Sequence, residues 1–300
     1  MDGERSTAFP AFRRKTPGLS RFERFAAIDW SGAKGSRHKG IAIAMCDAGD
    51  AAPRLIQHEG PWSRGEVLDW LRVQAAEAPT LFGFDFSFAP PILERGAYLP
   101  GEKIPSRAKA FWAYVDSRCE DEDLGAASFL EHHHRRHFYF GAADGVKADF
   151  LHHRACEKAF NATGGGKAST VYDAIGASQV AKASFAGMRL LHHLNGEVPV
   201  WPFDPLTDHG SVVVEIYTRL FIRLAGLPGR KVRTLELLNL ALASLGSRPF
   251  AARGDPDDHQ TDVLISAAGL RAIADDPFYW SPEALTPHIA RTEGWTFGIA

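Results

Sequence analysis

Three apolar, strand-like runs of the sequence each end on a carboxylate. They are FAAID, closed by Asp29, LFGFD, closed by Asp85, and VVVE, closed by Glu215. A short, mostly apolar run is typical of a strand buried on both faces. An acid that closes such a strand lies at its carboxyl end, where open α/β sheets bind their ligands. Parallel neighbours lie about 4.8 Å apart, so they would gather these acids together.

Carboxylates held this close repel one another, and each raises the pKa of its neighbours unless a cation lies between them. A bound divalent metal ion would keep them ionised. The sequence DDHQTD, near the end of the chain, supplies further ligands. Asp258 and Asp262 are four residues apart, and His259 and Asp262 are three apart, so each pair would share one face of a helix.

The predicted catalytic groups are therefore Asp29, Asp85, Asp262 and His259, and the predicted metal ligands are Asp29, Asp85, Asp262 and Glu215. A carboxylate-rich set suits Mg²⁺ or Mn²⁺ better than zinc. Two such ions, about 3.5–4 Å apart, can activate a water and stabilise the leaving oxygen when a phosphodiester is hydrolysed. Asp29 would bridge them, and His259 would ligate one ion or protonate the leaving group.

Each acid also has a plainer interpretation as a helix cap or loop anchor. Glu215 could instead pair with Arg219 or Arg223 on the following helix, and Asp258 could cap the last helix. The metal-site interpretation is favoured because Asp29, Asp85 and Asp262 occur together in the elements that could bring them to one place.

The elements that would hold these residues follow from apolar periodicity and turn signals. Ser63 and Glu66 have the spacing of a capping box, and Pro277 follows the end of the last helix. We expect strands at residues 25–29, 40–45, 54–58, 81–86 and 211–217, a short extended piece at 200–203, and helices at 63–78, 178–194, 218–225, 234–245 and 257–275.

This order of elements is that of a ribonuclease H-like α/β fold, a five-stranded mixed sheet flanked by helices. In that fold the first, fourth and fifth strands are parallel neighbours, and the last helix packs beside the first strand. We expect a single domain over residues 25–280, with a large insertion at about 90–178 and a C-terminal tail at 281–300. The basic segment 1–24 is expected to be disordered or to form an arm that contacts nucleic acid.

Composition narrows the class of protein. The chain has 300 residues, of which 45% are hydrophobic, and a net charge of −2, which argues against holding duplex DNA chiefly by bulk charge. The three cysteines lack metal-binding spacing and read as reduced thiols. No apolar run approaches the about 20 residues of a membrane span, and no secretory signal begins the sequence, so we expect a cytoplasmic protein.

Several residues are candidates for contacts with a nucleic acid or nucleotide substrate. Trp30 and Ser31 follow Asp29 directly, and Lys167 and Ser169 lie in the glycine-rich loop TGGGKAST, which lacks the spacing of a P-loop. Trp30 is otherwise a core or wall residue. The run EHHHRRH, residues 131–137, could bind a transition metal or could form a solvated helix face.

The motifs FAAIDWSGAKG, LFGFDFSF, VWPFD, VVVEIYTRL and DHQTDVLISAAGLRAIA resemble those of the family catalogued as domain of unknown function 429, regarded as predicted ribonuclease H-like nucleases. The resemblance covers roughly residues 24–90 and 165–275. HQTD and the apolar run after it also resemble the final helix of RuvC-type junction resolvases. By that likeness Asp29 and Asp85 match the first- and fourth-strand acids, and His259 and Asp262 match the helical pair.

The resemblance implies a metal-dependent nuclease. Asp85 is a departure, because resolvases have glutamate there, and Glu215 is an acid that those enzymes do not need. Two other classes stay open: a ribonuclease H-like module that binds or regulates without catalysis, and a nucleotide phosphotransferase of the kind formed by two copies of this core. The sequence holds one copy, which favours the nuclease.

Overall fold

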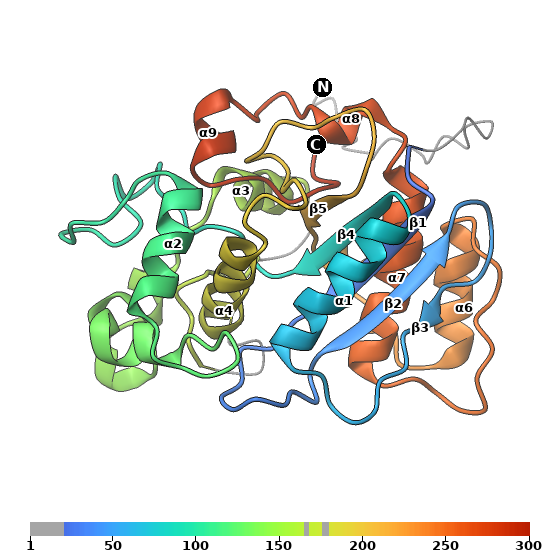
Figure 1. Cartoon of the computed structure of the whole chain (residues 1–300), viewed down its shortest axis with the longest axis horizontal. Helices are drawn as coiled ribbons and strands as arrows, with labels where there is room; N and C mark the ends of the chain where they lie inside the picture. Colours follow the sequence, from blue (N-terminus) through green and yellow to red (C-terminus); the bar gives the residue numbers. More distant parts are fainter. Residues whose placement is uncertain (1–20, 165–167, 176–179) are drawn as a thin grey trace, which may run out of the picture.

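The computed structural model describes residues 21–164, 168–175 and 180–300, and its centre is a single five-stranded sheet (Figure 1). The strand order is β3-β2-β1-β4-β5. β1 pairs antiparallel with β2 and parallel with β4, and β5 continues the parallel half. The strands are β1 (Arg24–Asp29), β2 (Ala42–Asp47), β3 (Arg54–Leu55), β4 (Thr80–Asp85) and β5 (Val212–Glu215). The expected mixed α/β sheet, an antiparallel meander followed by parallel strands, is confirmed.

The register of the parallel strands decides which acids share a face. Asp29 of β1 lies directly beside Asp85 of β4. Glu215 of β5 lies beside Phe84, one residue earlier on β4. Successive side chains of a strand point to opposite faces, so Glu215 leaves the sheet on the face opposite that of Asp29 and Asp85.

Helices cover both faces of the sheet (Figure 1). α5, α6 and α7 lie on the face that carries Asp29, in a core that contains Phe25, Ala27 and Leu81. α1 and α4 lie on the other face, in a core with Ile28 and Phe84, and α2 packs outside α4. The helices are α1 (Arg64–Glu77), α2 (Ala108–Arg118), α3 (Ala155–Ala162), α4 (Val180–His193), α5 (Thr218–Leu224), α6 (Leu235–Ser244), α7 (Asp258–Ile273), α8 (Pro277–Trp280) and α9 (Pro287–Arg291).

The helix starts show how far local signals set the boundaries. Ser63 caps α1, and the predicted capping box with Glu66 is present in both directions. α7 has a second capping box, formed by Asp257 and Gln260. The cap of α7 is therefore Asp257, and the expectation that Asp258 caps this helix is wrong.

Several expected strands are shorter in the structure. β3 spans Arg54–Leu55 instead of residues 54–58, and β5 ends at Glu215 instead of Tyr217. The extended piece expected at residues 200–203 is a turn that follows Val200, which bridges to Val213. α4 is described from Val180, so its expected start at residue 178 lies outside the described residues.

The expected insertion is an irregular, partly helical region that lies mainly on one face of the sheet. Besides α2 and α3 it contains the short turns η1 (Phe129–His133), η2 (Arg135–His137), η3 (Ala142–Asp144) and η4 (Lys147–Phe150). This region contributes buried residues to the core on the α1 and α4 side of the sheet, among them Phe111, Trp112 and Tyr172. α3 is the exception, because its Cys156 and Phe160 join the core on the α7 side.

Residues 281–300 belong to the folded domain and do not form the expected free tail. Trp295 and Phe297 are fully buried, and Thr296 makes a parallel bridge to Glu215, which extends the sheet beyond β5. At the other end, Phe22 is buried and β1 already begins at Arg24. Residues 1–20, expected to be disordered, lie outside the described part of the chain. Within that part, no helix is long and apolar enough to cross a membrane.

Candidate functional site

Two carboxylates meet at the carboxyl end of the parallel strands. Asp29 ends β1 and Asp85 ends β4, in register and on one face of the sheet. Between Arg24 and Asp29 of β1, and between Thr80 and Asp85 of β4, all residues are apolar or glycine, so the acids are the polar groups at the carboxyl ends of these strands. The Asp29 side chain retains 18% of its exposure. The predicted pairing of these two strand ends is confirmed.

The first turn of α7 covers this pair. His259 Nδ1 donates to Asp29 Oδ2 across 2.6 Å. This bond raises the pKa of His259, and partial burial opposes the rise. The ring is 51% exposed. With the bond to Asp29 made through Nδ1, Nε2 is left to exchange a proton with a bound molecule or with water.

Asp85 is the most deeply placed of the acids. Thr218, the first residue of α5, donates from Oγ1 to Asp85 Oδ2 across 3.2 Å, and its hydroxyl also bonds Ser266 of α7 at 3.0 Å. Burial raises the pKa of Asp85 well above its ordinary value, and the charges of Asp29 and Asp262 add to the rise. Both effects favour the neutral, protonated form of this carboxyl.

Asp262 lies one turn further along α7 and faces the same strand ends. Burial raises its pKa to about 7, and the charges of Asp29 and Asp258 add to this effect. Within residues 21–164, 168–175 and 180–300, no lysine or arginine forms a salt bridge with Asp85 or Asp262. Three acids thus lie together, and the basic side chain bonded to one of them is His259.

This arrangement fits a divalent ion by its chemistry, because hard carboxylate oxygens are what Mg²⁺ and Mn²⁺ bind. The acids are not drawn tightly around one point, however. In the described part of the chain, the only set of three His, Cys, Asp or Glu ligand atoms that all lie within 4.8 Å of one another is Glu102, His134 and His137. Carboxylates without a cation between them repel one another.

Glu215 has a different role from the one predicted. Its oxygens accept from both terminal nitrogens of buried Arg154, from Phe88 N at 2.8 Å and from Thr296 Oγ1 at 2.6 Å. Its place on the opposite face and these donors leave it out of the carboxylate group around Asp29. An arginine does pair with it, but this is Arg154 of the insertion and not Arg219 or Arg223.

The four predicted substrate contacts have four different outcomes. Trp30 is buried and packs edge-on against Phe84, with ring centroids 5.7 Å apart, so it is a core residue and is not available to stack on a base. Ser31 lies beside the site, since its hydroxyl and the His259 ring both flank Gly40. Ser169 is exposed on a loop, and the backbone N–H of the preceding residue, Ala168, donates to Asn161 of α3. Lys167 lies outside the described residues.

Sequence reasoning missed two features of the site. One is Thr218, which donates to Asp85; a threonine at the start of a helix is common, and nothing in the sequence linked it to Asp85. The other is the basic pair Lys231 and Arg233, each 3.5 Å from Asp258 at the start of α7, with side chains 69% and 64% exposed. The sequence contains the run RKVR at residues 230–233, but it does not indicate that this run lies beside DDHQTD in space.

Comparisons with protein-family models, with curated proteins and with solved structures found no match. The chemistry of the site is therefore inferred from its own residues. The resemblance to the domain of unknown function 429 and to resolvases stays a prediction.

Proposed function

We propose that the protein is a divalent-metal-dependent phosphodiesterase of ribonuclease H-like architecture that acts on nucleic acid or a nucleotide. The observation that carries the proposal is the group formed by Asp29, Asp85 and Asp262. It consists of carboxylates that end parallel strands in register, with a third acid on the covering helix and no lysine or arginine in a salt bridge with Asp85 or Asp262 among the described residues. A group so costly to assemble without a cation is typical of a functional site.

The proposal gives each residue a role. Asp29, Asp85 and Asp262 would hold Mg²⁺ or Mn²⁺, and Thr218 would keep Asp85 in place. The bound ion would supply Lewis acidity toward the phosphate and lower the pKa of a bound water. His259, bonded to Asp29 through Nδ1, would pass a proton through Nε2 to the leaving oxygen.

Two basic side chains near the start of α7 support a phosphate-containing substrate. Lys231 and Arg233 lie beside Asp258 in the first turn of α7, and both side chains are largely exposed. Phosphate oxygens are common partners of such residues. A substrate held there would place a phosphodiester at the carboxylates, and Lys231 and Arg233 would offset the negative charge of its backbone.

The topology supports the ribonuclease H-like part of the proposal. An antiparallel three-stranded meander is followed by parallel strands, and the last long helix, α7, packs against β1 and β2. This is the arrangement that the sequence order predicts for that fold. The acids occupy its first strand, fourth strand and last long helix.

The experiment is a cleavage assay of the full-length protein with Mg²⁺ or Mn²⁺ on branched DNA, RNA–DNA hybrid, single-stranded DNA and single-stranded RNA. We expect metal-dependent cleavage of at least one substrate by the wild type. Asp29→Asn should reduce the rate by at least about 10²-fold, because it removes a carboxylate that would hold the metal ion at the reacting phosphate. Adding a chelator to the wild-type protein should abolish cleavage.

A matched control is Asp47→Asn. Asp47 ends β2 and lies opposite Arg24, the first residue of β1, so it is at the other end of the strands from Asp29, on the surface beside Arg54. This variant should cleave like the wild type. No cleavage by wild type on any substrate, or equal cleavage by Asp29→Asn, would refute the proposal.

The rival class is a module of the same architecture that binds without cleaving. The open spacing of the acids is the observation in its favour. Calorimetry with Mn²⁺ separates the two classes. A nuclease should bind Mn²⁺, and the Asp85→Asn variant should not. Measurable ATP hydrolysis would instead support a phosphotransferase.

A further inference from the structure

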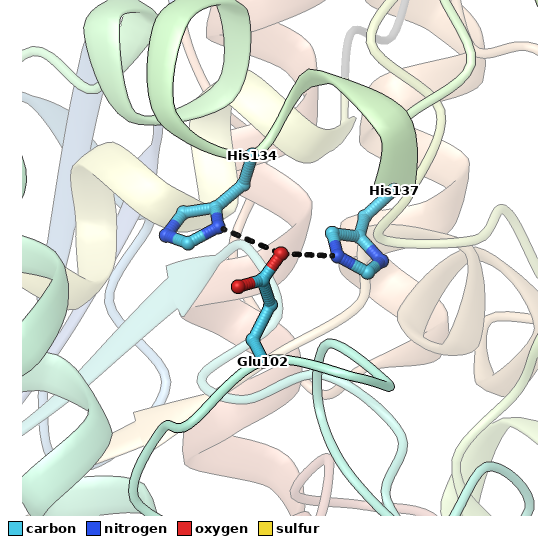
Figure 2. Close-up of side chains that lie close together, drawn as sticks. All are labelled: Glu102, His134 and His137. Carbon is cyan, nitrogen blue, oxygen red and sulfur yellow. Dashed lines mark hydrogen bonds and ion pairs between the residues drawn. The ribbon is translucent and has the colours of Figure 1, made fainter.

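The histidine-rich run of the insertion folds into two short turns that bury two of its four histidines. η1 and η2 place His134 and His137 on the same side, and each imidazole is only 6% exposed. Glu102 reaches them from the loop before α2, more than 30 residues earlier in the chain. Figure 2 shows the Glu102 carboxylate between the two rings, with one oxygen facing a nitrogen of each.

The three ligand atoms are close to the spacing of a metal site. Glu102 Oε1 lies 3.3 Å from His137 Nε2 and 3.8 Å from His134 Nδ1, and all three atoms lie within 4.8 Å of one another. Nitrogen and oxygen ligands about 2.0–2.1 Å from a tetrahedral zinc ion are about 3.4 Å apart. Small side-chain adjustments would therefore bring the three atoms onto one ion.

His134 carries an unsatisfied nitrogen that points to this use. Its Nδ1 is buried and has no hydrogen-bond partner. Its Nε2 lies 3.1 Å from the hydroxyl of Tyr114 on α2. When Nε2–H donates to Tyr114, the lone pair of Nδ1 faces Glu102 with nothing bound, and such outer partners commonly orient histidines that ligate metals.

A side-chain cation already approaches this group. Arg136 Nη2 donates to Glu102 Oε1 across 2.8 Å, and Arg136 Nε lies 3.2 Å from His137 Nε2. The Arg136 side chain is 64% exposed, so it can swing away into solvent. The guanidinium thus stands on the open side of the group, where a metal ion and its water ligand would replace it.

We propose that Glu102, His134 and His137 bind one divalent transition-metal ion, with zinc preferred. Two imidazoles and one carboxylate are a zinc-type donor set, which differs from the all-carboxylate group around Asp29. The ion would fasten the loop of Glu102 to η1 and η2 and so brace the insertion. This proposal does not rest on the nuclease function.

The test uses full-length protein stripped with a chelator and titrated with Zn²⁺ by calorimetry, in excess Mg²⁺ to occupy the carboxylate group. We expect one equivalent of Zn²⁺ to bind the wild type and to raise its melting temperature. Glu102→Gln and His137→Gln should each weaken the affinity at least about tenfold, because each removes a ligand. Co²⁺ bound in place of Zn²⁺ should give the visible spectrum of a four-coordinate ion.

Two further variants keep the result clear if a ligand variant fails to fold. Arg136→Ala changes an exposed side chain and should bind Zn²⁺ several-fold more tightly, because it removes the competing cation. His132→Gln, an exposed histidine of the same run, and Asp29→Asn should bind like the wild type. No Zn²⁺ binding by wild type and Arg136→Ala, or binding lost only in Asp29→Asn, would overturn the proposal.

Discussion

Asp85 and Asp262 are acids that the fold places near Asp29 and largely out of water. Burial and mutual repulsion raise the pKa of both, Asp262 to about 7 and Asp85 well above its ordinary value. Ionising them without a cation costs free energy that the folded protein must supply. Buried acids with raised pKa values are common at catalytic and ligand-binding sites, and this is why these two side chains carry the functional proposal.

The pH dependence of stability tests this view of Asp262. Its pKa is about 7 in the folded protein against an ordinary value of 3.8, so between these pH values the folded state binds more protons than the unfolded state. Without divalent metal, the free energy of unfolding should therefore fall as pH rises from about 4 to about 7. His259, whose pKa is also raised, acts in the same direction as pH passes through its folded value.

Urea denaturation at several pH values, with a chelator present, measures this slope. One pKa unit corresponds to about 1.4 kcal/mol, so Asp262 contributes at most about 4 kcal/mol. Asp262→Asn should flatten the profile in this window, and saturating Mn²⁺ should raise stability most at pH 7 and above. An identical slope in wild type and Asp262→Asn would contradict the assigned environment.

His259 should matter for proton transfer more than for metal affinity. Its Nδ1 is committed to Asp29, and its ring is half exposed. His259→Gln should lower kcat for phosphodiester cleavage by about 10²–10⁴-fold and change the Mn²⁺ affinity only a few-fold. Loss of Mn²⁺ binding in parallel with activity would instead make His259 a metal ligand.

At the scale of elements, the site depends on how closely α7 approaches the sheet. Gly83 of β4 makes room for this approach, since a Cβ there would lie 2.7 Å from Ile216 Cγ2 and 2.8 Å from Leu270 Cδ1 of α7. The same contact holds the first turn of α7, with His259 and Asp262, over the strand ends. The chemistry of the site thus depends on an apolar contact at some distance from the acids.

Gly83→Ala should therefore destabilise the protein by about 1–3 kcal/mol, because overpacking forces neighbouring side chains or α7 to shift. It should also weaken Mn²⁺ binding. Chemical denaturation and calorimetry measure both effects. Gly254→Ala is the control, since a Cβ at Gly254 meets nothing within 4 Å. Equal stability of Gly83→Ala and wild type would show that α7 does not need this close packing.

The sequence predicted the parts of this arrangement that local patterns encode. Apolar runs that end in acids located β1 and β4, and the spacing of Ser63 and Glu66 located the start of α1. The register of β5 was not encoded locally, because one residue of slip moves a side chain to the other face. Glu215 was therefore assigned to the wrong partners, while Asp29 and Asp85 were correctly paired.

At the scale of the whole molecule, buried charge ties distant segments together. Arg154, before α3, bonds Glu215 of β5, and Glu293 accepts from the backbone of Ile92 and Ala155. Thr296 completes the group through its hydroxyl on Glu215. The insertion, the sheet and the C-terminal segment thus meet in one network, and such long-range pairings leave no pattern in the sequence.

Glu215→Gln should therefore act on folding and not on metal binding. Breaking a buried ion pair costs about 3–5 kcal/mol, and the loss here should lie toward the lower figure, because Arg154 keeps its ion pair with Glu157. Denaturation would show the loss, and calorimetry on the folded fraction should give an unchanged Mn²⁺ affinity. Glu283→Gln, exposed in the same C-terminal segment, should change neither. Loss of Mn²⁺ binding in folded Glu215→Gln would return Glu215 to the ligand set.

The most direct test of the central claim is anomalous scattering from crystals of the full-length protein soaked in Mn²⁺. We predict at least one peak between Asp29, Asp85 and Asp262, within about 2.0–2.3 Å of a carboxylate oxygen of each acid that ligates the ion. The carboxylates should lie closer together than they do without the ion. No peak at these residues at saturating Mn²⁺ would contradict the claim that the strand-end acids form a divalent metal site.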